Sequence, residues 1–130
     1  MKIITFICII SVVSLNTFPQ SSNKREMFAT SFNVFFEKFK KDSTFQISST
    51  IYPFKVIDVD DEGNITRFIQ KKDWKYISFE GKNVLLKQVW FSKTKVDVQF
   101  SIQDTGILVD HFFEYRNGKW WHVYAKNQSD

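Results

Sequence analysis

The stretch that decides the fold runs from Gly106 to Ala125 and reads GILVDHFFEYRNGKWWHVYA. Two runs rich in β-branched and aromatic residues flank the dipeptide Asn117-Gly118. This dipeptide is the strongest short-range signal for a two-residue hairpin, because a type I′ turn requires positive φ at both central residues. The sequence therefore predicts two paired antiparallel strands near its C-terminal end.

The turn also fixes which side chains share a face of this hairpin. Pairing outward from the turn places Tyr115 opposite Trp120 and His111 opposite Tyr124, and side chains alternate between faces along each strand. One predicted face carries Val109, His111, Phe113, Tyr115, Trp120, His122 and Tyr124. The other carries Leu108, Asp110, Phe112, Glu114, Trp121, Val123 and Ala125. Since both faces hold large apolar side chains, we expect a sheet covered on both faces, or one that curls around a cavity and packs a helix on its concave face.

The rest of the chain predicts helices first and strands afterwards. Residues 23–41 form an amphipathic helix, because five phenylalanines fall on one stripe of a 3.6-residue period: Phe28, Phe32, Phe35, Phe36 and Phe39. Asp42 opens a short second helix. A hairpin spans residues 55–70, a helical turn covers residues 72–76, and strands are expected over residues 84–91 and 96–102.

The N-terminus resembles a secretory signal peptide. Lys2 precedes an apolar run of about eleven residues, Ile3 to Val13, which is shorter than the roughly 17–25 residues of a membrane span. We expect cleavage near Gln20, which gives a signal peptide at residues 1–20 and a single domain at residues 21–130. Cys8 lies inside the apolar run and is not preceded by small residues, so no lipoprotein anchor is expected. The predicted mature form is periplasmic or secreted, is not inserted in a membrane and contains no cysteine.

Composition limits the classes of function. The chain is 18% aromatic, with fifteen Phe and four Trp, and carries a net charge of +4 spread along its length. This modest, scattered charge argues against nucleic-acid binding. The sequence has no glycine-rich phosphate loop, serine nucleophile elbow or His-Glu-x-x-His motif. We therefore expect no cofactor.

Two groups of side chains could suggest a metal site. The segment from Asp58 to Asn64 contains four acids and a glycine at the sixth position, as in a calcium-binding loop, but the twelfth position is Ile69 rather than glutamate. An acidic hairpin tip is the better interpretation. His111 and His122 share the predicted hairpin face, but no carboxylate of the hairpin joins them there as a third ligand. No metal is expected, and the two histidines are interpreted as packed side chains.

Asp110 is the strongest candidate for chemistry. It shares its predicted face with Phe112, Trp121 and Val123, and a carboxylate on an apolar face must be paired or has a raised pKa. If that face lines a concave cavity, Asp110 becomes a weak candidate for a general base or a ligand anchor. The alternative is a structural ion pair with Lys87, Lys93, Lys95 or Arg67. The predicted ligand-binding residues are Asp110, Phe112, Glu114, Trp121 and Val123, and the predicted interface residues are Tyr115, Trp120 and Tyr124.

This order of elements resembles the nuclear transport factor 2-like (cystatin-like) superfamily. More narrowly, the motifs Phe35-Phe36-Glu37-Lys38-Phe39, Tyr52-Pro53-Phe54 and Trp120-Trp121-His122-Val123 look like an uncharacterised family of small exported Bacteroidetes proteins. The resemblance implies an α+β fold, a cone-shaped roll in which N-terminal helices pack on a curved antiparallel sheet. The superfamily includes steroid isomerases and dehydratases, and also ligand-binding and dimerising domains without chemistry.

The function expected from these observations is non-enzymatic. We expect the domain to bind a small hydrophobic or amphipathic ligand, or a protein partner, through the cone cavity or the sheet. The alternatives are an acid–base enzyme of the isomerase or dehydratase kind, centred on Asp110, and a homodimerisation module. The sequence does not decide between them, because fold does not imply function.

Overall fold

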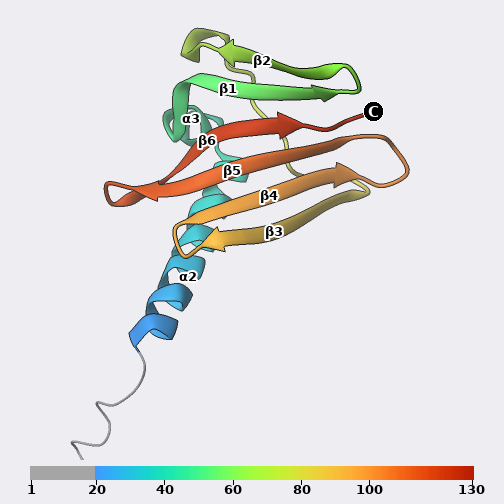
Figure 1. Cartoon of the computed structure of the whole chain (residues 1–130). Coiled ribbons are helices and arrows are strands. Elements are labelled where there is room, and N and C mark those ends of the chain that lie inside the picture. Colours follow the sequence, from blue (N-terminus) through green and yellow to red (C-terminus); the bar gives the residue numbers. More distant parts are fainter. Residues whose placement is uncertain (1–19) are drawn as a thin grey trace, which may run out of the picture.

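Two helices precede a six-stranded sheet in the computed structural model, which describes residues 20–130 and their side chains from residue 23 (Figure 1). The helices are α2 (Gln20–Lys41) and α3 (Ser43–Ser48). The strands are β1 (Thr50–Asp60), β2 (Gly63–Ile69), β3 (Val84–Ser92), β4 (Lys95–Ile102), β5 (Leu108–Arg116) and β6 (Lys119–Asn127). A 3-10 helical turn, η3 (Lys71–Asp73), follows β2. This is the predicted order of elements, with bounds that differ by a few residues.

The predicted signal peptide lies outside the described residues except for Gln20, so it stays a prediction. In the part of the chain that the structure does describe, no helix combines the length and the apolar character needed to cross a membrane.

The sheet has the strand order β2-β1-β6-β5-β4-β3. Neighbouring strands are antiparallel except β1 and β6, which are parallel and pair Val56 with Ala125. The prediction of a wholly antiparallel sheet is therefore wrong at this one pair. The chain leaves β2 at one edge of the sheet and enters β3 at the other edge (Figure 1). Hairpin signals fix only strands that are neighbours in sequence, so they do not reveal how the first strand meets the last.

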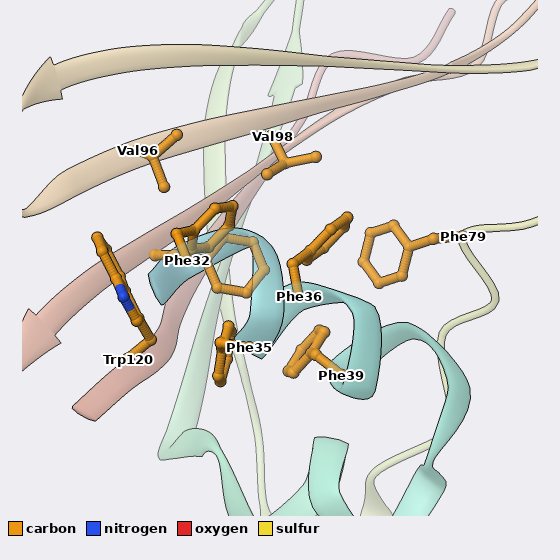
Figure 2. Packing of buried hydrophobic residues seen from close by; sticks show 9 residues of the cluster. Phe32, Phe35, Phe36, Phe39, Phe79, Val96, Val98 and Trp120 are labelled. Atoms are coloured by element: carbon orange, nitrogen blue, oxygen red, sulfur yellow. The ribbon is translucent and has the colours of Figure 1, made fainter. Parts of the chain in front are cut away.

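Helix α2 supplies the core by packing its phenylalanine stripe against β3 to β6 (Figure 1). Phe32 and Phe39 are fully buried, and the ring centroid of Phe32 lies 5.0 Å from that of Trp120. Figure 2 shows the phenylalanine rings of the helix packed against Phe79, Val96 and Trp120. Full burial of one such side chain contributes roughly 1.5–3 kcal/mol, so the stripe contributes several kcal/mol to the stability of the fold. The predicted core face of the helix is confirmed.

A side-chain cap starts α3 as the sequence predicts. Asp42 has an extended backbone, and its Oδ1 accepts a hydrogen bond from the backbone N–H of Phe45 at 3.0 Å. Such a cap satisfies one of the free donors at the helix N-terminus and contributes typically about 1 kcal/mol.

The C-terminal hairpin turns at Asn117 and Gly118, with φ values of 50° and 84°, as a type I′ turn requires. Near the turn the register is the predicted one, with Tyr115 opposite Trp120. It then shifts between Phe112 and Phe113, because Val123 is an extra residue in β6.

The shift corrects two predicted side-chain positions. Phe112 pairs with Tyr124 and His111 pairs with Ala125. Tyr124 and Ala125 therefore each lie on the face opposite to the predicted one. A bulge of this kind has no local sequence signal here, since neither glycine nor proline stands near Val123.

Candidate functional site

A cavity of about 450 Å³ lies on the face of the sheet that carries α2. Small-molecule sites typically have volumes of about 300–1,000 Å³. Strands β1, β2, β5 and β6 form its floor, and the segment after β2 forms its wall. The lining is mostly apolar, with a few polar groups from the floor and from the wall. The lining residues are Phe54, Val56, Arg67, Phe68, Ile69, Asp73, Trp74, Lys75, Ile77, Val109, His111, Ala125 and Asn127.

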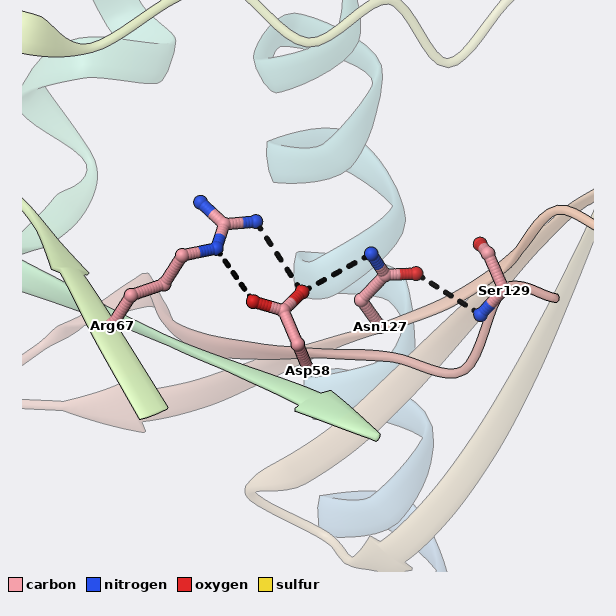
Figure 3. Close-up of polar contacts among 4 residues, drawn as sticks. All are labelled: Asp58, Arg67, Asn127 and Ser129. Atoms are coloured by element: carbon pink, nitrogen blue, oxygen red, sulfur yellow. Dashed lines mark hydrogen bonds and ion pairs between the residues drawn. The ribbon is translucent and has the colours of Figure 1, made fainter. Parts of the chain in front are cut away.

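A polar group of three side chains stands at the edge of this cavity (Figure 3). The Nε of Arg67 lies 2.7 Å from Oδ2 of Asp58, and Nδ2 of Asn127 donates to Oδ1 of Asp58 at 3.2 Å. The backbone N–H of Ser129 donates to Oδ1 of Asn127 at 3.0 Å. The hydrogen bond from Arg67 lowers the pKa of Asp58. The aspartate is therefore engaged in holding β1, β2 and β6 together beside the cavity.

Gln46 fixes the wall of the cavity from behind. Its side chain is fully buried, and its Nε2 donates to the carbonyl of Phe39 at 3.2 Å and to that of Ile77 at 3.0 Å. Its Oε1 accepts from the backbone N–H of Ile77 at 2.8 Å and from Nε1 of Trp74 at 3.2 Å. Every donor and acceptor of this amide is thereby satisfied. Since Trp74 and Ile77 both line the cavity, Gln46 sets the position of its wall.

Two buried histidines lie at the inner end of the cavity. His111 lines it, and Nδ1 of His111 lies 3.0 Å from Nε2 of His122. On its other side, Nδ1 of His122 lies 3.4 Å from Oγ1 of Thr50. Burial lowers the pKa of His111 to about 3, and burial followed by the neighbouring His111 lowers that of His122. Both rings are therefore neutral at neutral pH.

The opposite face of the sheet, which we call the open face, holds a pair of acids. Within residues 20–130 no helix packs against this face (Figure 1). Asp97 and Asp110 are 3% and 4% exposed, and Asp110 accepts a hydrogen bond from Nε2 of Gln128. Burial, and then the charge of Asp110, raises the pKa of Asp97 to about 7. The carboxyl group of Asp97 therefore keeps its proton over much of the acidic range.

The structure separates the predicted ligand-binding residues from the cavity. Asp110, Phe112, Glu114 and Trp121 lie on the open face, where the rings of Phe112 and Tyr124 stack with centroids 4.2 Å apart. Phe112, Glu114 and Val123 line a separate hollow of about 330 Å³ there. Asp110 does not line the cavity, and among residues 20–130 it forms no ion pair with Lys87, Lys93, Lys95 or Arg67.

The predicted interface residues are also divided between the faces. Trp120 is only 2% exposed and packs against Phe32 in the core. Tyr115 packs edge-on against Phe28 of α2, with ring centroids 5.0 Å apart. Only Tyr124 lies on the open face, so it is the one predicted interface residue that a partner there could contact.

Sequence reasoning missed most of the residues that build the cavity. Gln46 stands in a short helix and looks like any polar side chain, and Trp74 belongs to an irregular segment without periodicity. Gln46 has no signal in the sequence. The one signal for Trp74 is its position in a charged segment between Lys72 and Lys75, because a tryptophan side chain is seldom left fully exposed to water. The sequence predicted that His111 and His122 share a face of the hairpin, but it did not predict that their rings are in contact.

Comparison with known proteins defines the fold and no more. No family model matches the chain, and no curated protein shows significant sequence similarity to it. An NTF2-like protein from Bacteroides fragilis aligns with 74% of this chain at 14% identity and a TM-score of 0.55. The match spans 46% of the Bacteroides fragilis chain. A cystatin-like protein from Bacteroides caccae aligns over 73% of this chain and 74% of its own, at 17% identity and a TM-score of 0.53.

These likenesses, with the helices packed on a curved mixed sheet, establish an NTF2-like, cystatin-like α+β fold. The predicted fold class is confirmed. At identities this low the solved structures transfer no activity or ligand to the chain.

Proposed function

We propose that the chain is an exported, non-enzymatic domain that binds a small hydrophobic or amphipathic ligand in the cavity of its cone. The observation that carries the proposal is the cavity of about 450 Å³, which is lined largely by apolar side chains such as Phe54, Trp74 and Val109. Apolar pockets with a few convergent polar groups are the usual form of a small-molecule site. The proposal of export rests on the sequence of residues 1–20 alone.

The arrangement of titratable groups favours binding over acid–base catalysis. A general base at neutral pH needs a pKa near 7, whereas burial lowers the pKa of His111, inside the cavity, to about 3. The carboxyl group whose pKa is raised to about 7 belongs to Asp97, on the other face of the sheet. The hypothesis of an acid–base enzyme centred on Asp110 would therefore require a substrate-binding site on the open face, separate from the cavity.

The proposal is tested by native mass spectrometry on protein purified from its own host. We expect extra mass that is released on denaturation. The variant Val109→Phe places a larger side chain in the cavity and should abolish the extra mass. The matched control Val123→Phe adds the same ring on the open face and should keep it. Mass retained by Val109→Phe and lost in Val123→Phe would instead place the ligand, or a protein partner, on the open face.

A second candidate function, homodimerisation, is supported by a separate observation. The open face exposes large apolar side chains, with Phe91 63% and Leu85 54% exposed. Exposed apolar patches on a sheet commonly mark protein–protein contacts. Sedimentation equilibrium at tens of micromolar tests this reading for dimers tighter than about −6 to −7 kcal/mol. A dimer that dissociates on Phe91→Lys would support it, and a wild-type monomer would refute it.

A further inference from the structure

We infer that the ligand of the cavity carries a neutral hydrogen-bond donor, an alcohol or phenol hydroxyl, which binds Nε2 of His111. The inference rests on the proposed function and adds the chemical class of the ligand. It follows from the way a chain of three side chains decides where the protons of the two histidines lie.

The chain begins at Thr50, whose hydroxyl has a single proton to donate. Its Oγ1 lies 2.8 Å from the backbone carbonyl oxygen of Gln46 and 3.4 Å from Nδ1 of His122. The carbonyl oxygen can only accept, so the hydroxyl must donate to it. The oxygen of Thr50 is then left as an acceptor toward His122. Nδ1 of His122 must therefore carry the proton.

The proton on Nδ1 of His122 determines the state of His111. A neutral imidazole has one donor and one acceptor nitrogen, so Nε2 of His122 is an acceptor. That atom lies 3.0 Å from Nδ1 of His111, which must then donate to it. The remaining nitrogen of His111, Nε2, carries a lone pair and no proton. Because both rings are buried and neutral, this arrangement holds at neutral pH.

A ligand that binds next to the lone pair on Nε2 of His111 must donate a hydrogen bond to it. His111 lines the cavity, its Nδ1 is turned to His122, and within residues 20–130 no group donates to its Nε2. Among the described residues, the fully buried polar side-chain atoms without a partner lie elsewhere, so Nε2 of His111 is open to the cavity, where a hydroxyl would donate to it in place of water. A carboxylate offers only acceptors to this nitrogen and would be repelled. The apolar walls around His111, such as Val109 and Ala125, fit the hydrocarbon body of an alcohol or phenol.

The inference is tested with three fluorescent probes of one ring system: naphthalene, 2-methoxynaphthalene and 2-naphthol. We expect all three to bind, because each has the apolar body, and we expect 2-naphthol to bind about 3- to 10-fold more tightly, the effect of one net hydrogen bond. Equal affinity for 2-naphthol and 2-methoxynaphthalene would overturn the inference and leave the proposed function standing. If none of the probes binds, both fall.

Thr50 provides a control that does not touch the cavity lining. Thr50→Val removes the hydroxyl that fixes the protons and should abolish the preference for 2-naphthol. Thr50→Ser keeps the hydroxyl and should retain it. Long-range proton–nitrogen correlation spectra of the ligand-free protein should show the proton of His111 on Nδ1 in wild type and in Thr50→Ser. A proton on Nε2 of His111 in wild type, or a preference that survives Thr50→Val, would overturn the inference even if the variants differ in stability.

Discussion

Gln46 binds both backbone polar groups of Ile77 with one side-chain amide. Its Nε2 donates to the carbonyl of Ile77 at 3.0 Å, and the N–H of Ile77 donates to its Oε1 at 2.8 Å. The two hydrogen bonds reproduce what a neighbouring strand would supply to a segment that is not in the sheet. This contact joins α3 to the wall of the cavity, because Ile77 lines it.

The first prediction concerns this amide. Gln46→Met keeps the length of the side chain but leaves the backbone groups of Ile77 and the indole of Trp74 without partners. Each unsatisfied buried group costs roughly 1–3 kcal/mol, so we expect the free energy of unfolding to fall by about 3 kcal/mol or more. Urea denaturation followed by tryptophan fluorescence measures the change.

Gln70→Met is the matched control for this substitution. Gln70 is exposed, and its side chain makes no capping hydrogen bond to η3. We expect a change within about 0.5 kcal/mol. Equal effects of the two substitutions would show that the amide of Gln46 does not hold the wall.

The second prediction concerns Phe32, which is fully buried and contacts the rings of Phe113 and Trp120. Phe32→Ala should lower the free energy of unfolding by about 3–5 kcal/mol, because it removes apolar contact and leaves a cavity. Val34→Ala, on the exposed face of the same helix, should change it by less than about 0.5 kcal/mol. A small effect at Phe32 would contradict the assignment of the core.

The core and the order of elements could be predicted because both follow from periodicity. Phe32, Phe36 and Phe39 recur at helical spacing, and Val96 and Val98 alternate at strand spacing. Burial of one face is the dominant favourable term in folding, so a pattern that collects apolar side chains on one face leaves few alternatives. The side chains that share a face of the hairpin were predicted by the same logic as far as the bulge, but the pattern did not show which of the two faces the helix covers.

The cavity could not be predicted because it depends on contacts without a period. Gln46 reaches Trp74 and Ile77 across about thirty residues, a separation that no spacing rule covers. The extra residue in β6, Val123, moved Tyr124 to the open face and Ala125 to the cavity. A shift of one residue exchanges the faces of a strand, so the predicted faces of Tyr124 and Ala125 were wrong even though the turn was right.

The third prediction concerns the turn of the C-terminal hairpin. Gly118 has a φ of 84°, and a Cβ placed there would meet no atom within 4 Å. Gly118→Ala should therefore cost only the backbone strain of an L-residue with positive φ, about 1–2 kcal/mol. Asn117→Gly at the neighbouring position, where φ is 50°, should change stability much less because glycine accepts that conformation. Thermal unfolding of the two variants measures both changes, and equal losses of stability would contradict backbone strain as the cause at Gly118.

The fourth prediction concerns the pH dependence of stability. The pKa of Asp97 is raised from 3.8 to about 7 in the folded state, so between these values the folded chain holds a proton that the unfolded chain has released. The contribution of this group to the free energy of unfolding therefore falls as the pH rises from about 4 to about 7. His111 acts in the opposite direction, because its pKa is lowered from 6.5 to about 3 and its contribution rises with pH across that window.

Asp97→Asn separates these two effects. The variant loses the falling contribution of Asp97 and keeps the rising contribution of His111. Its stability relative to wild type should therefore increase by about 4 kcal/mol between pH 4 and pH 8, because each pH unit between about 4 and about 7 contributes about 1.4 kcal/mol. Asp104→Asn, on an exposed turn with a φ of 63° that asparagine accepts, is the control for the loss of one carboxylate. Urea midpoints at five pH values measure both differences. Curves for Asp97→Asn and wild type that run parallel would mean that the pKa of Asp97 is not raised in the folded state.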